Sequence, residues 1–89
     1  TLICSGDDSS IGICIEGNPG MAVGGMGDLL AGVIGSLMAQ GEPLGNATRM
    51  GACLHGEAGD LAARLGEKGM LASDLLPFLR QLMNPECAE

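Results

Sequence analysis

Aromatic residues are nearly absent from this 89-residue sequence: Phe78 is the only one, and tryptophan and tyrosine are missing. Large aromatic side chains usually anchor the core of a small domain. A chain of this length also buries only about 60 to 65% of its unfolded surface, and its sixteen glycines supply no side-chain volume. We therefore expect the sequence to be a fragment of a larger domain.

Basic residues and long apolar runs are scarce as well. Four lysines and arginines against eleven acids give a net charge of −7, which repels nucleic acids and anionic lipids. The longest strongly apolar stretch, 29–39, is well short of the roughly 20 residues that cross a membrane. The composition argues against nucleic-acid and membrane partners, and no secretory signal begins at Thr1, which favours a reduced, cytoplasmic location.

Paired metal ligands are missing too. The sequence has one histidine, His55, and four cysteines that form no CxxC pair: Cys4, Cys14, Cys53 and Cys87. Zinc sites usually draw their ligands from such pairs, so we predict no metal-binding residues and free thiols. His55 lies at the edge of an apolar helical stripe and is interpreted as structural.

Two β-prone runs, 1–5 and 11–16, flank a cluster of turn formers and predict a β-hairpin. Apolar residues at steps of three and four then predict a helix over 28–40, and the small residues on its other side suggest burial on both faces. Ser73 is the predicted N-cap of a last helix that ends near Met83, with Pro77 in its first turn. Asp74 is interpreted as a capping acid.

A middle helix is predicted over 46–65, with Gly66 as its C-cap. Asp60 belongs to its polar face. Its expected inward stripe is Ala47, Met50, Leu54, Ala58, Leu61 and Leu65. The expected fold class is therefore α/β, with an N-terminal hairpin followed by about three helices.

The segment 17–27 holds five glycines and a proline, and it leads into the first helix. Glycines 20, 24, 25 and 27 permit positive φ and let a ligand touch the backbone. Unpaired N–H groups of Gly25, Met26 and Gly27 and the helix dipole attract phosphate there. Asp28 adds a carboxylate that can accept a proton, although an acid in a first helical turn is also common without any catalytic role. The loop matches neither the Rossmann nor the Walker pattern.

The run NPGMAVGGMGDLLAG, residues 18–32, resembles the signature of the C-terminal domain of the NAD(P)H-hydrate repair enzymes. Downstream, LHG at 54–56, AGD at 58–60 and LASDL at 71–75 resemble the same family in the same order. The likeness extends from residue 17 to about residue 82. It identifies the chain as resembling the ADP-dependent NAD(P)H-hydrate dehydratases of the ribokinase-like superfamily.

The resemblance implies a partial ribokinase-like fold, with residues 1–89 as the C-terminal part of a single dehydratase domain. It implies that Asp28 contacts the hydrate and acts as the catalytic base, and that Asn18 contributes to substrate binding. The implied anion hole for the nucleotide consists of Gly24, Gly25, Met26 and Gly27.

The implied activity is that of a hydro-lyase. The terminal phosphoryl group of ADP passes to the hydroxyl of hydrated NADH or NADPH (NADHX or NADPHX), and loss of phosphate restores the nicotinamide. The resemblance also implies Mg²⁺ with the nucleotide and a homo-oligomeric parent protein. A small-molecule kinase of the same superfamily is one alternative, and an inactive fragment is the other. The family's lysine–glycine segment for the nucleotide would precede Thr1, so we expect the chain alone to be inactive.

Overall fold

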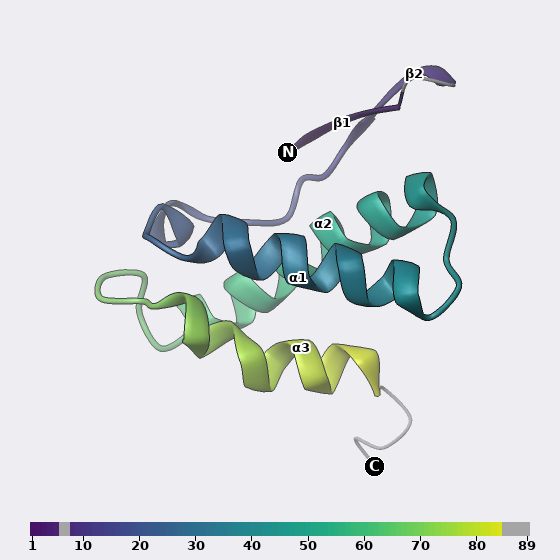
Figure 1. Ribbon diagram of the computed structural model, residues 1–89. Coiled ribbons are helices and arrows are strands. Elements are labelled where there is room, and N and C mark those ends of the chain that lie inside the picture. The colour runs from purple at the N-terminus through teal and green to yellow at the C-terminus, as the bar shows by residue number, and fades with distance from the viewer. Residues whose placement is uncertain (6–7, 85–89) are drawn as a thin grey trace.

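The computed structural model of the chain describes residues 1–5 and 8–84, in which a two-stranded hairpin precedes three α-helices (Figure 1). Strands β1 (Leu2–Ser5) and β2 (Asp8–Ile13) are antiparallel, with Leu2 opposite Ile13. The helices are α1 (Met26–Ala39), α2 (Leu44–Ala63) and α3 (Leu76–Met83). Two 3₁₀ turns, η1 (Pro19–Met21) and η2 (Ala72–Leu75), precede α1 and α3. The predicted order of a hairpin and three helices is confirmed.

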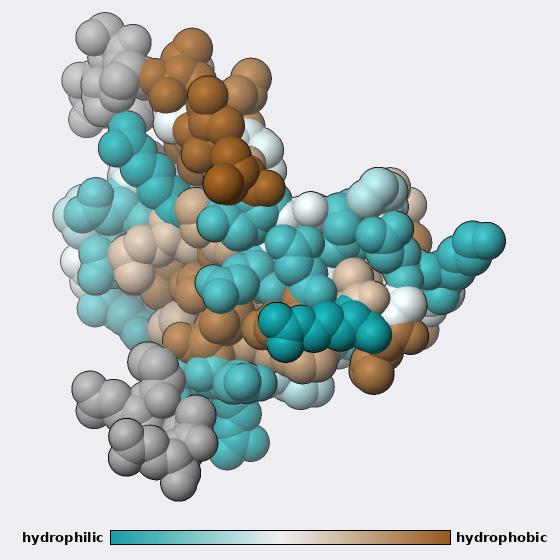
Figure 2. All heavy atoms as spheres, turned by 180° about the vertical axis from the view of Figure 1, so that it is seen from behind, coloured by the Kyte–Doolittle hydropathy of each residue, from teal (hydrophilic) through white to brown (hydrophobic). Residues whose placement is uncertain are grey.

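The hairpin projects away from the helices (Figure 1). Its second strand begins and ends three residues earlier than predicted, and residues 6 and 7 of the predicted turn lie outside the described residues. The alternation of side chains continues past the end of β2, so that Cys14 points inward, and the apolar side chains at every second position are exposed (Figure 2). These exposed residues are Ile11, Ile13 and Ile15, with Leu2 from β1. The outer face of the hairpin is therefore unpacked in this chain.

Helix α2 is the centre of the packing, because it contacts both α1 and α3. At 20 residues it reaches membrane-spanning length, yet no helix among the described residues is apolar enough to cross a bilayer. The main core lies where the three helices and η2 meet. Its buried members are Met26, Ala58, Ala62, Met70, Leu75 and Leu79.

Helix α2 begins and ends two residues before the predicted helix, and its C-cap is Arg64 and not Gly66. Its buried face also differs from the predicted stripe, since Met50 and Leu65 are exposed. Neighbouring segments approach α2 too closely for large side chains. A Cβ on Gly51 would lie 2.6 Å from Ile34 Cγ1 of α1. The residues that α2 buries are instead mostly small: Ala47, Gly51, Ala52, His55, Gly56, Ala58, Gly59 and Ala62.

Helix α1 begins two residues before the predicted start, at Met26, and it is not buried on both faces. Its bulky stripe packs toward α2, and Met26 and Leu37 are buried. The face with Gly32, Gly35, Ser36 and Ala39 is exposed, because no described element covers it.

The start of the last helix was also predicted wrongly. Asp74, rather than Ser73, supplies the cap: its Oδ2 accepts a hydrogen bond of 2.8 Å from Leu71 N. This hydrogen bond caps the N-terminus of η2, and α3 follows from Leu76. Pro77 lies in the first turn of α3, where its missing N–H costs no helical hydrogen bond. The predicted end at Met83 and the capping role of Asp74 are confirmed.

His55 joins α2 to the first residue of α1. The residue is 8% exposed, and its ring is hydrogen-bonded to the backbone of Met26. The Nε2 atom has no hydrogen-bond partner among the described residues. Burial lowers the pKa of His55 below its usual value of 6.5, which agrees with the interpretation of this histidine as a structural residue.

The close packing of α2 predicts a contrast between two of its glycines. A Cβ on Gly56 would lie 2.9 Å from the Glu16 carbonyl oxygen, whereas one on Gly45 would meet nothing within 4 Å. We expect Gly56→Ala to lower the free energy of unfolding by about 1–3 kcal/mol. Gly45→Ala is expected to raise it by up to about 1 kcal/mol, because alanine favours the helix. Urea denaturation followed by circular dichroism measures both, and a Gly56→Ala chain as stable as wild type would contradict the packing.

The burial of His55 predicts a pH dependence of stability. Since its pKa is lower in the folded chain, the unfolded chain takes up the proton first as the pH falls below about 6.5. The free energy of unfolding should therefore decrease from pH 7.5 to pH 5.5, a window in which no other ordinary side chain titrates. Urea denaturation of His55→Asn at the same pH values is the control, and a slope that persists in this variant would assign the effect to another group.

Candidate functional site

The glycine-rich loop is fixed to α2 by one carboxylate. Asp60 Oδ2 accepts a hydrogen bond of 3.0 Å from Gly17 N, and Asp60 Oδ1 accepts one of 2.9 Å from Asn18 Nδ2. Asn18 Oδ1 in turn accepts a hydrogen bond of 3.0 Å from Gly20 N and caps η1. These three bonds hold the entry to the loop against the middle helix.

Asp60 is therefore more than the polar-face residue that the sequence suggested. The acid is half-buried, and its partners lie 42 and 43 residues earlier in the chain. Asp60 is also four residues before Arg64, a spacing that is typical of a solvated pair on a helix surface. The spacing of Gly56 and Asp60 was a better indication of the role of Asp60. It places both residues on one helix face, and the chain at Glu16, just before the loop, packs on Gly56.

Gly17 adopts φ +122°, and glycine is required at two further points of the loop. A Cβ on Gly20 would lie 2.8 Å from the Glu67 carbonyl oxygen, so η1 packs directly on the chain that follows α2. Gly25 adopts φ +90° and turns the chain into α1. Positive φ was also expected to be available at glycines 20, 24 and 27, but Gly27 is part of the helix and none of the three uses it.

The N-terminus of α1 presents backbone donors without a side-chain cap. Gly25 is the N-cap, and the first helical bond is that from Leu29 N to Gly25 O, at 3.0 Å. The N–H groups of Gly25, Met26, Gly27 and Asp28 consequently have no acceptor within the helix. Gly24, Gly25 and Gly27 are exposed, whereas the Met26 side chain is buried. Met26 thus offers only its backbone to a ligand.

Asp28 lies in the first turn of α1 and is exposed. Its carboxylate and the free N–H groups therefore belong to the same helical turn. This arrangement places a proton acceptor beside a site with the polarity that an anion requires.

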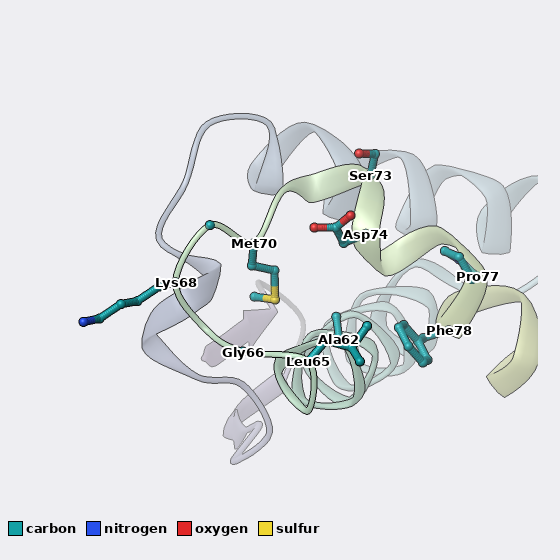
Figure 3. A pocket seen from close by; sticks show the side chains of 10 residues that line it. Ala62, Leu65, Gly66, Lys68, Met70, Ser73, Asp74, Pro77 and Phe78 are labelled. Atoms are coloured by element: carbon teal, nitrogen blue, oxygen red, sulfur yellow. The ribbon is translucent and has the colours of Figure 1, made fainter.

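Two hollows flank these elements. One, of about 350 Å³, is lined by Asn18, His55 and Glu16 among others. The other, of about 400 Å³, lies between the end of α2 and α3 (Figure 3). In Figure 3 the Lys68 side chain points away from this second hollow, and Asp74 already accepts the Leu71 N–H. The second hollow therefore offers an anion little charge complementarity.

Comparison with known proteins connects this geometry to one family. The family model described as NAD(P)H-hydrate dehydratase matches residues 1–81. The bifunctional NAD(P)H-hydrate repair enzyme Nnr of Vibrio cholerae is 53% identical over 79 residues, which cover 88% of this chain and 16% of that protein. The Nnr enzyme of Escherichia coli is 46% identical over 90 positions, covering 100% of this chain and 17% of its own length.

A shorter relative carries the dehydratase name alone. The ADP-dependent (S)-NAD(P)H-hydrate dehydratase of Neisseria meningitidis is 43% identical over 86 residues, 94% of this chain and 29% of that protein. The chain thus spans about one sixth of the bifunctional relatives and under a third of the Neisseria protein. No solved structure matches the chain. With a family match over residues 1–81, this chain belongs to the NAD(P)H-hydrate dehydratase family.

Proposed function

We propose that this chain carries the phosphate-binding and proton-transfer site of an enzyme that restores NADH and NADPH from their hydrates, with ADP as phosphoryl donor. The observation that carries the proposal is the exposed, uncapped N-terminus of α1 with Asp28 in its first turn. Membership of the dehydratase family supports it, as does the ADP dependence named for the Neisseria relative.

In this proposal the backbone of residues 24–27 holds the phosphates of the nucleotide. Oriented N–H groups and the positive end of the helix dipole stabilise negative charge without side-chain rearrangement. Exposed glycines at 24, 25 and 27 leave the backbone open, and a Cβ at Gly24 or Gly27 would meet no described atom within 4 Å. The space that a phosphate needs is therefore free on the protein side.

Asp28 acts as the general base. It takes the proton of the hydrate hydroxyl while the hydroxyl oxygen bonds to the terminal phosphorus of ADP and the bond to the AMP oxygen breaks. The new phosphate ester is a better leaving group than hydroxide. Its carbon–oxygen bond then breaks, a proton leaves the neighbouring ring carbon, and the ring double bond returns. The products are NADH or NADPH, AMP and phosphate.

In this proposal Asn18 contributes to binding of the hydrate. Its amide already donates one hydrogen bond to Asp60 and accepts one from Gly20. An asparagine amide has two N–H groups and two carbonyl lone pairs, so one of each remains for the hydrate. The hollow that Asn18 lines is the space in which such a contact would be made.

The remaining features of the proposal follow the family. They are a ribokinase-like domain completed by other segments, a homo-oligomeric parent protein and a cytoplasmic location. Mg²⁺ commonly binds to nucleotide phosphates with one or two carboxylates, and Asp28 is the single carboxylate in the segment 24–28. That segment thus fits a Mg²⁺ ion held chiefly by the nucleotide.

The proposed activity predicts that a chimera is active. We would replace the matching 86 residues of the Neisseria dehydratase with this chain and supply NADHX and ADP. We expect absorbance from NADH to appear together with AMP and phosphate. A phosphorylated product without NADH would favour a small-molecule kinase. A folded chimera without any turnover would favour an inactive piece of the fold.

The role of Asp28 predicts a separation of rate from affinity. In the active chimera, Asp28→Asn should lower kcat by roughly 10² to 10⁴, the usual contribution of a general base, and the KM for ADP should change only a few-fold, because backbone groups hold the phosphates. Glu57→Gln, which removes one exposed acid from α2, is the charge-matched control. Steady-state kinetics of both variants measure kcat and the KM for ADP. Full turnover by Asp28→Asn would show that Asp28 is only an acid at the start of a helix and not the general base.

A further inference from the structure

The short segment between β2 and the glycine loop supplies a cysteine and an acid to a cluster that a second cysteine, from α2, completes. Cys14 is 4% exposed, and its Sγ lies 3.1 Å from Glu16 Oε2. Cys53, a residue of α2, lies close to both of them. One ligand atom from each of these residues lies within 4.8 Å of the other two. The sequence analysis predicted no metal-binding residues, because two cysteines that are 39 positions apart form no recognisable pair.

The backbone fixes the positions of all three residues. Cys14 N donates to Thr1 O at 2.8 Å, and the Thr1 amino group donates to Cys14 O at 3.0 Å. Glu16 lies against Gly56 at a distance that only glycine allows. Since Cys53 and Gly56 are three residues apart in α2, they share one helix face. The contact at Gly56 therefore also brings Cys53 to Cys14.

From this geometry we propose that Cys14, Cys53 and Glu16 form a binding site for a zinc ion. Zinc binds cysteine sulfur at about 2.3 Å and carboxylate oxygen at about 2.0 to 2.2 Å. Tetrahedral geometry at those lengths separates the ligand atoms by about 3.5 to 3.8 Å. Separations near the 4.8 Å limit of the cluster would shorten by about 1 Å, and the 3.1 Å separation of Cys14 Sγ and Glu16 Oε2 would widen by about 0.5 Å. Two thiolates exclude Mg²⁺ and Ca²⁺, which require oxygen ligands.

The site has three protein ligands, and water completes the coordination. Zinc sites with three protein ligands keep such an open position. The Asp60 carboxylate lies close enough to act electrostatically on Glu16, which adds negative charge beside the cation.

A zinc ion at this position would tie the hairpin to α2. The hairpin projects from the helices and exposes its outer face (Figures 1 and 2). A ligand that binds only the folded chain stabilises it by mass action. Zinc should therefore raise the melting temperature of the reduced chain, whereas Mg²⁺ should not.

Cobalt is the spectroscopic probe for this site. We would titrate the full 89-residue chain with Co²⁺ under a phosphine reductant and then add Zn²⁺. We expect thiolate-to-cobalt charge-transfer absorption and the visible bands of tetrahedral cobalt, saturating at a single equivalent and lost on adding Zn²⁺. Cys53→Ser should weaken binding by more than about tenfold. It is the main variant because Cys53 is exposed and its loss leaves the core intact.

Matched variants separate the cluster from the other thiols. Cys14→Ser and Glu16→Gln should also weaken binding, whereas Cys4→Ser and Cys87→Ser should not. In the wild-type chain, Zn²⁺ should slow alkylation of Cys53 but not of the exposed Cys4. Absence of the charge-transfer band would overturn the proposal, as would binding that survives Cys53→Ser or equal protection of Cys4 and Cys53.

Discussion

The close approach of neighbouring segments to the small-residue face of α2 is the constraint on which the rest of the structure depends. Gly51 admits Ile34 of α1, Gly56 admits the backbone of Glu16, and Gly59 admits the side chain of Met21. Each contact positions a different element: the first helix, the segment after the hairpin, and η1. Dispersion forces favour such contacts only when no side chain intervenes. The start of the glycine loop is therefore held in place by close contacts with α2.

The order of elements was predictable because hydrophobic spacing and turn residues are local signals. The same signals failed for the buried face of α2, where Met50 and Leu65 were expected inside and are exposed. A periodic pattern identifies a helix, but the partner's distance decides whether large or small side chains line the interface. The prediction of where α3 starts was wrong for a related reason. Asp74 and Ser73 are both good caps, and only the folded chain shows Asp74 reaching Leu71 N.

The candidate site also has features that local sequence patterns predict and features that they do not. A glycine turn that leads into a helix with an early acid is a local pattern, and the structure places Gly25 and Asp28 as that pattern suggests. The partners of Asp60 and the meeting of Cys14 with Cys53 arise from contacts between distant segments. A local pattern can place Gly56 and Asp60 on one helix face, but it does not identify the distant segment that meets that face. Spacing alone left two roles open for Asp28, a catalytic base and an acid at the start of a helix. The likeness to the dehydratases favoured the catalytic base.

The central claim is that the backbone at the start of α1 binds phosphate. The most direct test is an NMR titration of the ¹⁵N-labelled active chimera with AMP and phosphate, which reports on individual backbone N–H groups. The claim predicts that the amide signals of Gly25, Met26 and Gly27 shift together, with those of Gly66 and Gly69 unchanged. Shifts confined to the chain around Gly66 and Gly69, with no change at the start of α1, would contradict it.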